Sequence, residues 1–210
     1  MPLIHHPDEL PVWCEMHFYE ILTLSPGQTH TCKRVDKKEK IIVNSGLCQI
    51  SWGGQTVQAE RGSNLDLVTP EHEFIVSGIQ QETTLLRIAG DWGEITGGSG
   101  VWTIQNSDDP HDKGDPVDYL KETNFDSHYH DYDEYWIFFS GRGIAVSEGI
   151  EYEVGAGDCI ATGMGHHHDL PRVFEPILAA FFETTVGGQG RRGHLWNHTH
   201  GIAQPQLDRI

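Results

Sequence analysis

The segment HYHDYDEYWIFFSGRG carries the residue types of this 210-residue chain that are best suited to chemistry. His128 and His130 are two positions apart, so an extended strand would project both side chains from one face. Glu134 has the same parity, and His168 follows at the end of GDCIATGMGHHH. Three imidazoles and one carboxylate suit Fe(II), Mn(II), Ni(II), Zn(II) or Co(II). The sequence therefore predicts one divalent metal ion on these four residues, with positions left open for a substrate.

The spacing of these residues resembles the motifs of the cupin superfamily. The first motif, H-x-H-x3-E-x6-G, is matched in full and ends at Gly141. The second, G-x5-P-x-G-x2-H, is matched at Gly157, Gly165 and His168, while Gly163 stands in the place of the proline. The resemblance implies a metal-binding jelly-roll barrel, also called a double-stranded β-helix.

Short runs rich in β-branched and aromatic residues dominate the chain, and turn residues separate them. Such a pattern predicts an all-β barrel or sandwich. The runs are His17–Leu24, Ile41–Val43, Leu47–Trp52, Leu65–Val68, Glu73–Val76, Thr84–Ile88, Glu134–Phe139, Ile144–Val146, Tyr152–Val154 and Ile177–Thr184.

A weak internal repeat divides the chain into halves. SPGQTHTC corresponds to NFDSHYH, and GSNLDLVTPEH corresponds to GDCIATGMGHHH. Two copies of one barrel explain this pattern most simply. We therefore predict an all-β fold of two tandem cupin barrels, at residues 1–90 and 125–210. The polar segment 91–124 would be a connector with a short helical turn at Val117–Glu122.

The first barrel lacks a complete ligand set. His30 and His72 fall at the places of the first and last ligands, but Cys32 replaces the second histidine. Glu39 lies too far from Cys32 to fit the motif. We therefore expect a structural first barrel without metal, although the sequence leaves open a second site on the two histidines.

The tail GRRGHLWNHTHG contains His194, His198 and His200. It has no carboxylate at motif spacing, so we expect a polar tail that packs over a barrel. Its histidines receive no role from the sequence.

Residues near the predicted ligands are candidates for contact with a substrate. If Glu134 points inward, strand alternation also sends Trp136 and Phe138 inward, as the wall of a small-molecule pocket. His167 is a further candidate for substrate binding because it precedes His168. The candidates for proton transfer are Glu134 itself, His166, Tyr152 and Glu183. Alternation along ILAAFFETTV favours an outward, solvated Glu183, with an inward acid or base as the alternative.

The same alternation places Tyr135, Ile137 and Phe139 on the opposite face of their strand. An apolar stripe of this kind is rarely left in water by a monomer, so we expect a homodimer that covers it.

The charge balance restricts the partners. A formal net charge of −17 argues against nucleic acid and anionic membranes, which attract positive surfaces. No apolar run reaches the ~20 residues needed to cross a bilayer, and the start of the chain lacks the features of a signal peptide. These observations predict a cytoplasmic protein that binds a small molecule.

Cupins include many reaction types, so the fold does not name a reaction. The leading hypothesis is a metal-dependent enzyme acting on a small hydroxy-carbonyl compound, derived from a sugar, by isomerase or lyase chemistry. The alternatives are an iron- or nickel-dependent dioxygenase and a sugar- or metal-binding protein without turnover. The sequence identifies neither the substrate nor the native metal.

Overall fold

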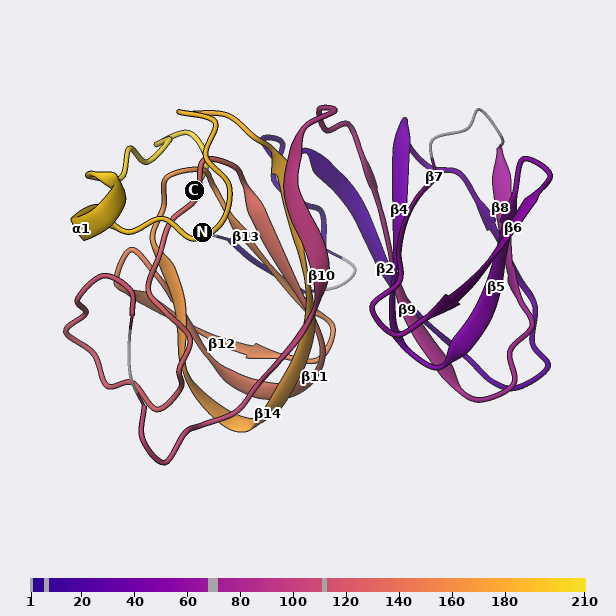
Figure 1. The fold of residues 1–210 in the computed structure, drawn as a ribbon, viewed down its shortest axis with the longest axis horizontal. Coiled ribbons are helices and arrows are strands. Elements are labelled where there is room, and N and C mark those ends of the chain that lie inside the picture. The colour runs from indigo at the N-terminus through magenta and orange to yellow at the C-terminus, as the bar shows by residue number, and fades with distance from the viewer. Residues whose placement is uncertain (1, 6–7, 68–71, 111–112) are drawn as a thin grey trace. The chain divides into compact units, whose positions relative to one another are not determined.

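Strands form most of the protein in the computed structural model, which describes residues 2–5, 8–67, 72–110 and 113–210 (Figure 1). Contacts divide the chain into two compact units. Unit 1 contains Met1–Cys14, Gly93–Gly98 and Trp102–Ile210, and unit 2 contains Glu15–Trp92 and Ser99–Val101. The fold is all-β, as the alternation of short apolar runs and turns predicts.

Unit 1 is built on one sheet, in which the strand order is β1-β13-β11-β14-β10 and β12 pairs with β11. Its strands are β1 (Leu3–His5), β10 (Thr96–Ile104), β11 (Glu134–Ser147), β12 (Ile150–Gly155), β13 (Asp158–Thr162) and β14 (His168–Thr185). The long pair β11–β14 bends through several bulges. At one of them Gly141 has φ +85°, and a Cβ there would lie 2.2 Å from the Pro176 carbonyl oxygen. Only glycine fits this place, which explains the glycine of the motif.

Unit 2 consists of two four-stranded sheets with the orders β2-β9-β4-β7 and β3-β8-β5-β6. Apolar side chains of both sheets, including Ile41, Ile50 and Leu85, form its buried core. The strands are β2 (Met16–Leu24), β3 (His30–Lys33), β4 (Lys38–Ser45), β5 (Leu47–Trp52), β6 (Gln55–Glu60), β7 (Asn64–Leu67), β8 (Glu73–Ser77) and β9 (Thr83–Gly90).

The boundaries of the units differ from the predicted ones. The predicted connector contains β10, which joins the sheet of unit 1, and Val117–Glu122 has no helical turn. The first residues belong to unit 1, where β1 pairs with β13 through Leu3 and Ile160. These pairings join residues far apart in the chain, so local sequence patterns could not reveal them. Val68, the last residue of one predicted strand, lies outside the described residues.

The apolar stripe predicted on β11 is not exposed. Tyr135 and Ile137 are both 0% exposed within the single chain, and only Phe139 is partly exposed. The Tyr135 ring stacks on Phe182 of β14, with a centroid distance of 6.3 Å. The expected homodimer therefore loses this support and stays a prediction.

The helix α1 (Asn197–His200) lies in the C-terminal tail. Among the residues that the structure describes, no helix combines the length and apolar character needed to cross a membrane.

A buried ion pair crosses the interior of unit 2. Arg87 donates through Nε to Glu39 Oε2 at 3.0 Å and through Nη2 to Glu39 Oε1 at 3.1 Å. The guanidinium also lies over the rings of Phe18 and Phe74, with its Cζ 5.2 Å from each centroid. Glu39, the carboxylate that is out of spacing for a metal site, is thus neutralised by a cation of the chain itself.

Replacing Arg87 should destabilise unit 2, because Glu39 would stay buried without its cation. We expect Arg87→Met to lower the free energy of unfolding by about 3–5 kcal/mol, measured by urea denaturation. The control is Arg142→Met, which removes an exposed ion pair with Glu153 and should leave the midpoint unchanged. Equal midpoints for the two variants would contradict the assignment.

Candidate metal centre

The four predicted ligand residues come together at one buried point in unit 1. Glu134 begins β11 and His168 begins β14. The segment before β11 runs beside β14, where His128 and His168 exchange backbone hydrogen bonds of 3.2 and 2.9 Å. One ligand atom from each of the four residues, His130 included, lies within 4.8 Å of all the others, and all four are buried. Segments distant in sequence thus place three imidazoles and a carboxylate around one centre.

Backbone carbonyls fix the orientation of the three imidazoles. The Nδ1 atoms of His128, His130 and His168 lie 2.8, 2.9 and 3.1 Å from the carbonyl oxygens of Asp126, Gly193 and His166, respectively. A carbonyl oxygen only accepts, so each Nδ1 carries a proton and each Nε2 presents a lone pair.

The Nε2 atoms point toward one another and toward the carboxylate. His128 Nε2 lies 3.0 Å from His130 Nε2. Glu134 Oε2 lies 3.1 Å from His130 Nε2 and 2.8 Å from His168 Nε2. Lone pairs at these distances repel unless a cation lies between them. The donor set therefore fits a transition-metal ion, which takes imidazole nitrogen together with carboxylate oxygen.

The pKa shifts agree with this need for a cation. Burial, and then the charges of His168 and His130, lower the pKa of His128 well below its usual value, so this ring stays neutral. Burial opposes the ionisation of Glu134, but the charges and hydrogen bonds of His130 and His168 outweigh it and lower the pKa of Glu134. These hydrogen bonds exist only when Nε2 carries a second ring proton; in the neutral ring Nε2 offers its lone pair, to which a metal ion would bind in place of that proton.

The C-terminal tail contributes to the centre through Gly193, whose carbonyl orients His130. Asp131 holds the tail there: its Oδ2 accepts from Arg191 Nε at 2.9 Å and its Oδ1 from Arg191 Nη2 at 3.1 Å. The Tyr132 hydroxyl accepts from the Gly193 N–H at 3.1 Å, and its ring stacks on His130. The tail is therefore part of the structure that positions a ligand.

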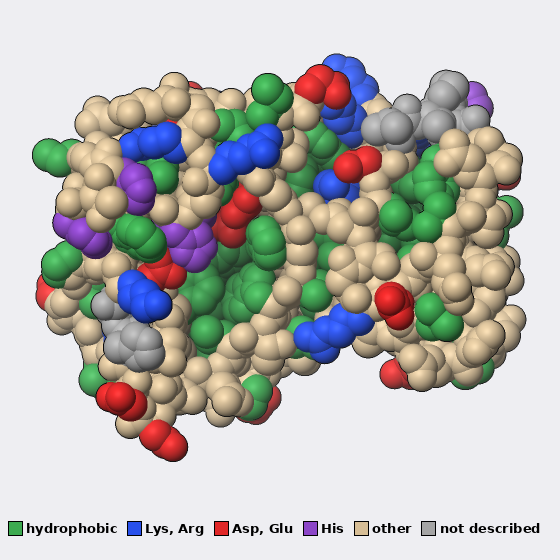
Figure 2. All heavy atoms as spheres, in the orientation of Figure 1, with side chains coloured by type: hydrophobic (Ala, Val, Ile, Leu, Met, Phe, Trp, Pro, Cys, Tyr) green, Lys and Arg blue, Asp and Glu red, His purple; other side chains and the backbone are tan. Residues whose placement is uncertain are grey.

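The predicted aromatic residues of β11 form a wall beside the four ligands. Trp136 is buried, and its ring meets the His168 ring at a centroid distance of 5.2 Å. Phe138 is also buried, with Trp102 6.3 Å away between centroids. Tyr152 packs against the same core from β12. Figure 2 shows a hollow in unit 1 with hydrophobic side chains at its floor and histidines at its rim.

The two histidines before His168 point to other partners. His166 Nε2 donates to the Gln206 carbonyl at 3.0 Å, so its ring is bound to the tail. His167 Nε2 lies 2.9 Å from Asp115 Oδ2. It lines a cavity of about 520 Å³ together with His168. His167 therefore faces a cavity next to a predicted ligand.

Glu183 points inward, which corrects the prediction of an outward position. It pairs with Glu134 across the strands, and residues directly opposite share one face of a sheet. Gly97 and Gly98 of β10 leave space for the Glu183 side chain. A Cβ on Gly97 would lie 2.6 Å from Glu183 Cβ and 2.7 Å from Tyr132 Cζ. Burial, and then the charge of Glu134, raise the pKa of Glu183 to about 7. A second carboxyl group therefore adjoins the candidate metal centre.

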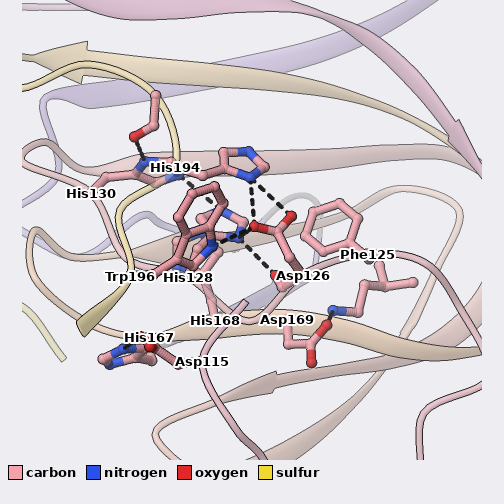
Figure 3. A network of polar contacts seen from close by, with 12 residues as sticks. Asp115, Phe125, Asp126, His128, His130, His167, His168, Asp169, His194 and Trp196 are labelled. Atoms are coloured by element: carbon pink, nitrogen blue, oxygen red, sulfur yellow. Dashed lines mark hydrogen bonds and ion pairs between the residues drawn. The ribbon is translucent and has the colours of Figure 1, made fainter. Parts of the chain in front are cut away.

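His194 lies near the centre, although the sequence analysis assigned it no role. Its ring stacks on His128 with a centroid distance of 3.7 Å and an angle of 3° (Figure 3). Its Nδ1 lies 2.9 and 3.0 Å from the two carboxylate oxygens of Asp126, and Trp196 Nε1 donates to the same carboxylate at 2.8 Å. The density of histidines in the tail was the only signal for this placement.

Comparison with known proteins gives the fold and the family. No protein-family model matches the chain. AerE from Microcystis aeruginosa aligns with a TM-score of 0.57 and 8% identity, over 85% of this chain and 97% of that one. A structure of oxalate decarboxylase aligns with a TM-score of 0.55 and 10% identity, over 81% of this chain and 69% of that one.

At such identities these likenesses show the fold alone, which is the all-β jelly-roll fold of the cupins. A protein of Sinorhizobium fredii, described as uncharacterized protein y4oW, is 40% identical over 211 residues, which cover 100% of this chain and 97% of that protein. The chain therefore belongs to the same family as y4oW.

Proposed function

We propose that the protein is a metal-dependent cupin enzyme that acts on a small hydroxy-carbonyl compound by isomerase or lyase chemistry. One divalent ion would be held by four residues, which are His128, His130, Glu134 and His168. The observation that carries the proposal is the fixed tautomer of the three imidazoles, which leaves each Nε2 lone pair facing the centre that they share with the carboxylate. A buried arrangement of this kind is stable only around a cation.

The surrounding residues support chemistry as well as binding. A divalent ion at this centre would polarise a substrate oxygen as a Lewis acid. Glu183 would hold or release a proton beside it, because its raised pKa of about 7 lies near neutrality. Tyr132 shares a hydrogen bond with Glu183 and so orients its carboxyl group. We therefore propose Glu183, rather than His166, as the residue that transfers the proton.

The aromatic cluster beside the candidate metal centre supports a small, partly apolar substrate. The aromatic rings of Trp102, Phe125 and Trp136 contact one another at 5.1 to 5.7 Å between centroids. Phe125 also lies 5.7 Å from the ring of His128. Aromatic faces next to polar groups are the common lining of small-molecule sites and suit the C–H faces of a sugar-derived compound.

Unit 2 would be a second cupin barrel with a structural role. Its buried carboxylate, Glu39, is neutralised by Arg87 in place of a metal ion. We therefore propose one metal ion per chain, in unit 1.

The test of the function is anaerobic purification with metal analysis, followed by a screen of sugars and keto acids. Anaerobic turnover with Mn(II) or Zn(II) would support the isomerase or lyase. Oxygen uptake with bound iron would instead identify a dioxygenase, which the same ligand set also suits. Tight substrate binding without product would leave a binding protein.

Removal of a ligand should abolish metal binding. We expect His128→Ala and His168→Ala each to lower the affinity for Zn(II) by more than about 100-fold. Mutation of a group that only supports a metal ligand lowers the affinity by about 10- to 100-fold, so loss of the ligand itself should have a larger effect. Calorimetric titration measures this effect. His198→Ala, which changes an exposed histidine of the tail, is the control. Full metal occupancy in a His128→Ala/His168→Ala double variant would refute the site.

Loosening the tail should weaken the centre without removing a ligand. Arg191→Met breaks the pair with Asp131, so the Gly193 carbonyl would orient His130 less well. We expect the affinity for Zn(II) to fall by about tenfold. The neighbouring exposed Arg192 provides the control, and Arg192→Met should bind as tightly as the parent protein. Equal affinities of both variants would show that the tail does not position His130.

Replacing Glu183 should separate chemistry from binding. Glu183→Gln keeps the shape of the side chain but cannot exchange a proton, so turnover of the substrate found in the screen should fall by about 100-fold or more. Metal content and substrate affinity, measured on the same preparation, should stay close to those of the parent. Turnover at the parent rate would remove Glu183 from the mechanism.

A further inference from the structure

A second cavity of about 380 Å³ lies in unit 1, on the side where the tail meets the segment before β11. It is lined by Lys113, Asn124, Asp126, His194 and Trp196. This volume suits a small molecule. Because His194 stacks on His128, the cavity adjoins the candidate metal centre.

The His194 ring is held by two contacts, and a third residue supports one of them. Its face lies on the His128 ring, and its Nδ1 faces both oxygens of the Asp126 carboxylate. Trp196 donates to the same carboxylate from the tail. Asp126 itself stays in place through its backbone, whose carbonyl accepts from His128 Nδ1 at 2.8 Å. A tail histidine with no function would not need such an arrangement.

The orientation of the ring directs its other nitrogen. The two stacked rings are parallel, and the Nδ1 atom of each faces Asp126 (Figure 3). The Nε2 atom of His194 therefore points away from Asp126, on the same side as the Nε2 atom of His128. Among the described residues, the recorded hydrogen bonds of the His194 ring all involve Nδ1, and 41% of the side chain is exposed.

We propose that His194 is a ligand-binding residue, whose Nε2 forms a hydrogen bond with an oxygen atom of a small hydroxy acid held between this cavity and the candidate metal centre. Asp126 and Trp196 are its positioning residues. Lys113, on the wall of the cavity, provides a positive charge for the carboxylate of the ligand. The proposal rests on the proposed function, since it places the substrate of the same centre.

Local charge supports this class of ligand. The protein as a whole carries a formal net charge of −17, which disfavours anions elsewhere on its surface. Asp126, the carboxylate on the cavity wall, faces His194 Nδ1 with both oxygens and accepts from Trp196 Nε1, so its hydrogen-bonding capacity is directed into the chain and away from a ligand.

The test uses the full chain loaded with Co(II), and glycolate as the probe because it has a hydroxyl next to a carboxylate. Calorimetry and the visible absorption of Co(II) report binding. In His194→Phe the ring can still stack on His128 but has no nitrogen, so the Kd for glycolate should rise about tenfold while the affinity for Co(II) stays unchanged. The control is His198→Phe, in the same tail, which should bind glycolate as the parent does.

A second variant tests the same contact without replacing His194, so that a change in the fold of the tail caused by His194→Phe can be recognised. Asp126→Asn keeps the backbone carbonyl that holds His128, and it should also weaken glycolate binding several-fold. Equal Kd values for the parent, His194→Phe and Asp126→Asn would overturn the inference, as would the absence of glycolate binding to the Co(II)-loaded parent. Failure of the parent to bind Co(II) would overturn the proposed function together with this inference.

Discussion

The structure of unit 1 depends on one electrostatic constraint: three imidazole lone pairs and a carboxylate share a buried point. Such groups repel one another and lose their hydration, so the arrangement is costly unless a cation is present. Backbone carbonyls set the ring tautomers that produce this arrangement. The carbonyls of Asp126, Gly193 and His166 each hold one Nδ1 proton, which leaves every Nε2 free to face the centre. The site is thus preorganised for a metal ion, because the tautomers are fixed by the fold.

The constraint extends to the end of the chain. Gly193 and His194 belong to the tail, yet one orients His130 and the other covers His128. Their positions depend on the ion pair between Asp131 and Arg191, and Asp131 lies next to a predicted ligand. The loop between His130 and Glu134 therefore has two tasks. It brings the carboxylate to the start of β11, and it holds the tail over the centre.

The sequence predicted the parts of the site that follow from local geometry. His128, His130 and Glu134 share a parity, and the spacing of the motif added His168, so the convergence of these four needed no knowledge of distant contacts. The prediction for Glu183 was wrong because alternation was counted along β14 alone. The sheet register, interrupted by bulges between β11 and β14, decides that Glu183 lies opposite Glu134. The strand β10 was missed for a related reason. Its glycines weaken the strand signal, although Gly97 is what allows Glu183 to be buried.

The two units differ in the cation that can neutralise a buried carboxylate. In unit 2 the guanidinium of Arg87 neutralises Glu39 with two hydrogen bonds, and its own faces are covered by Phe18 and Phe74. That cation is covalently part of the chain, so Glu39 is neutralised without a partner from outside. In unit 1 the groups around Glu134 are lone-pair donors, and no Lys or Arg side chain is recorded in contact with this carboxylate among the described residues. The cation must therefore come from outside, as a proton or a metal ion. A centre completed from outside can exchange its partner, and for this reason we place the proposed chemistry in unit 1.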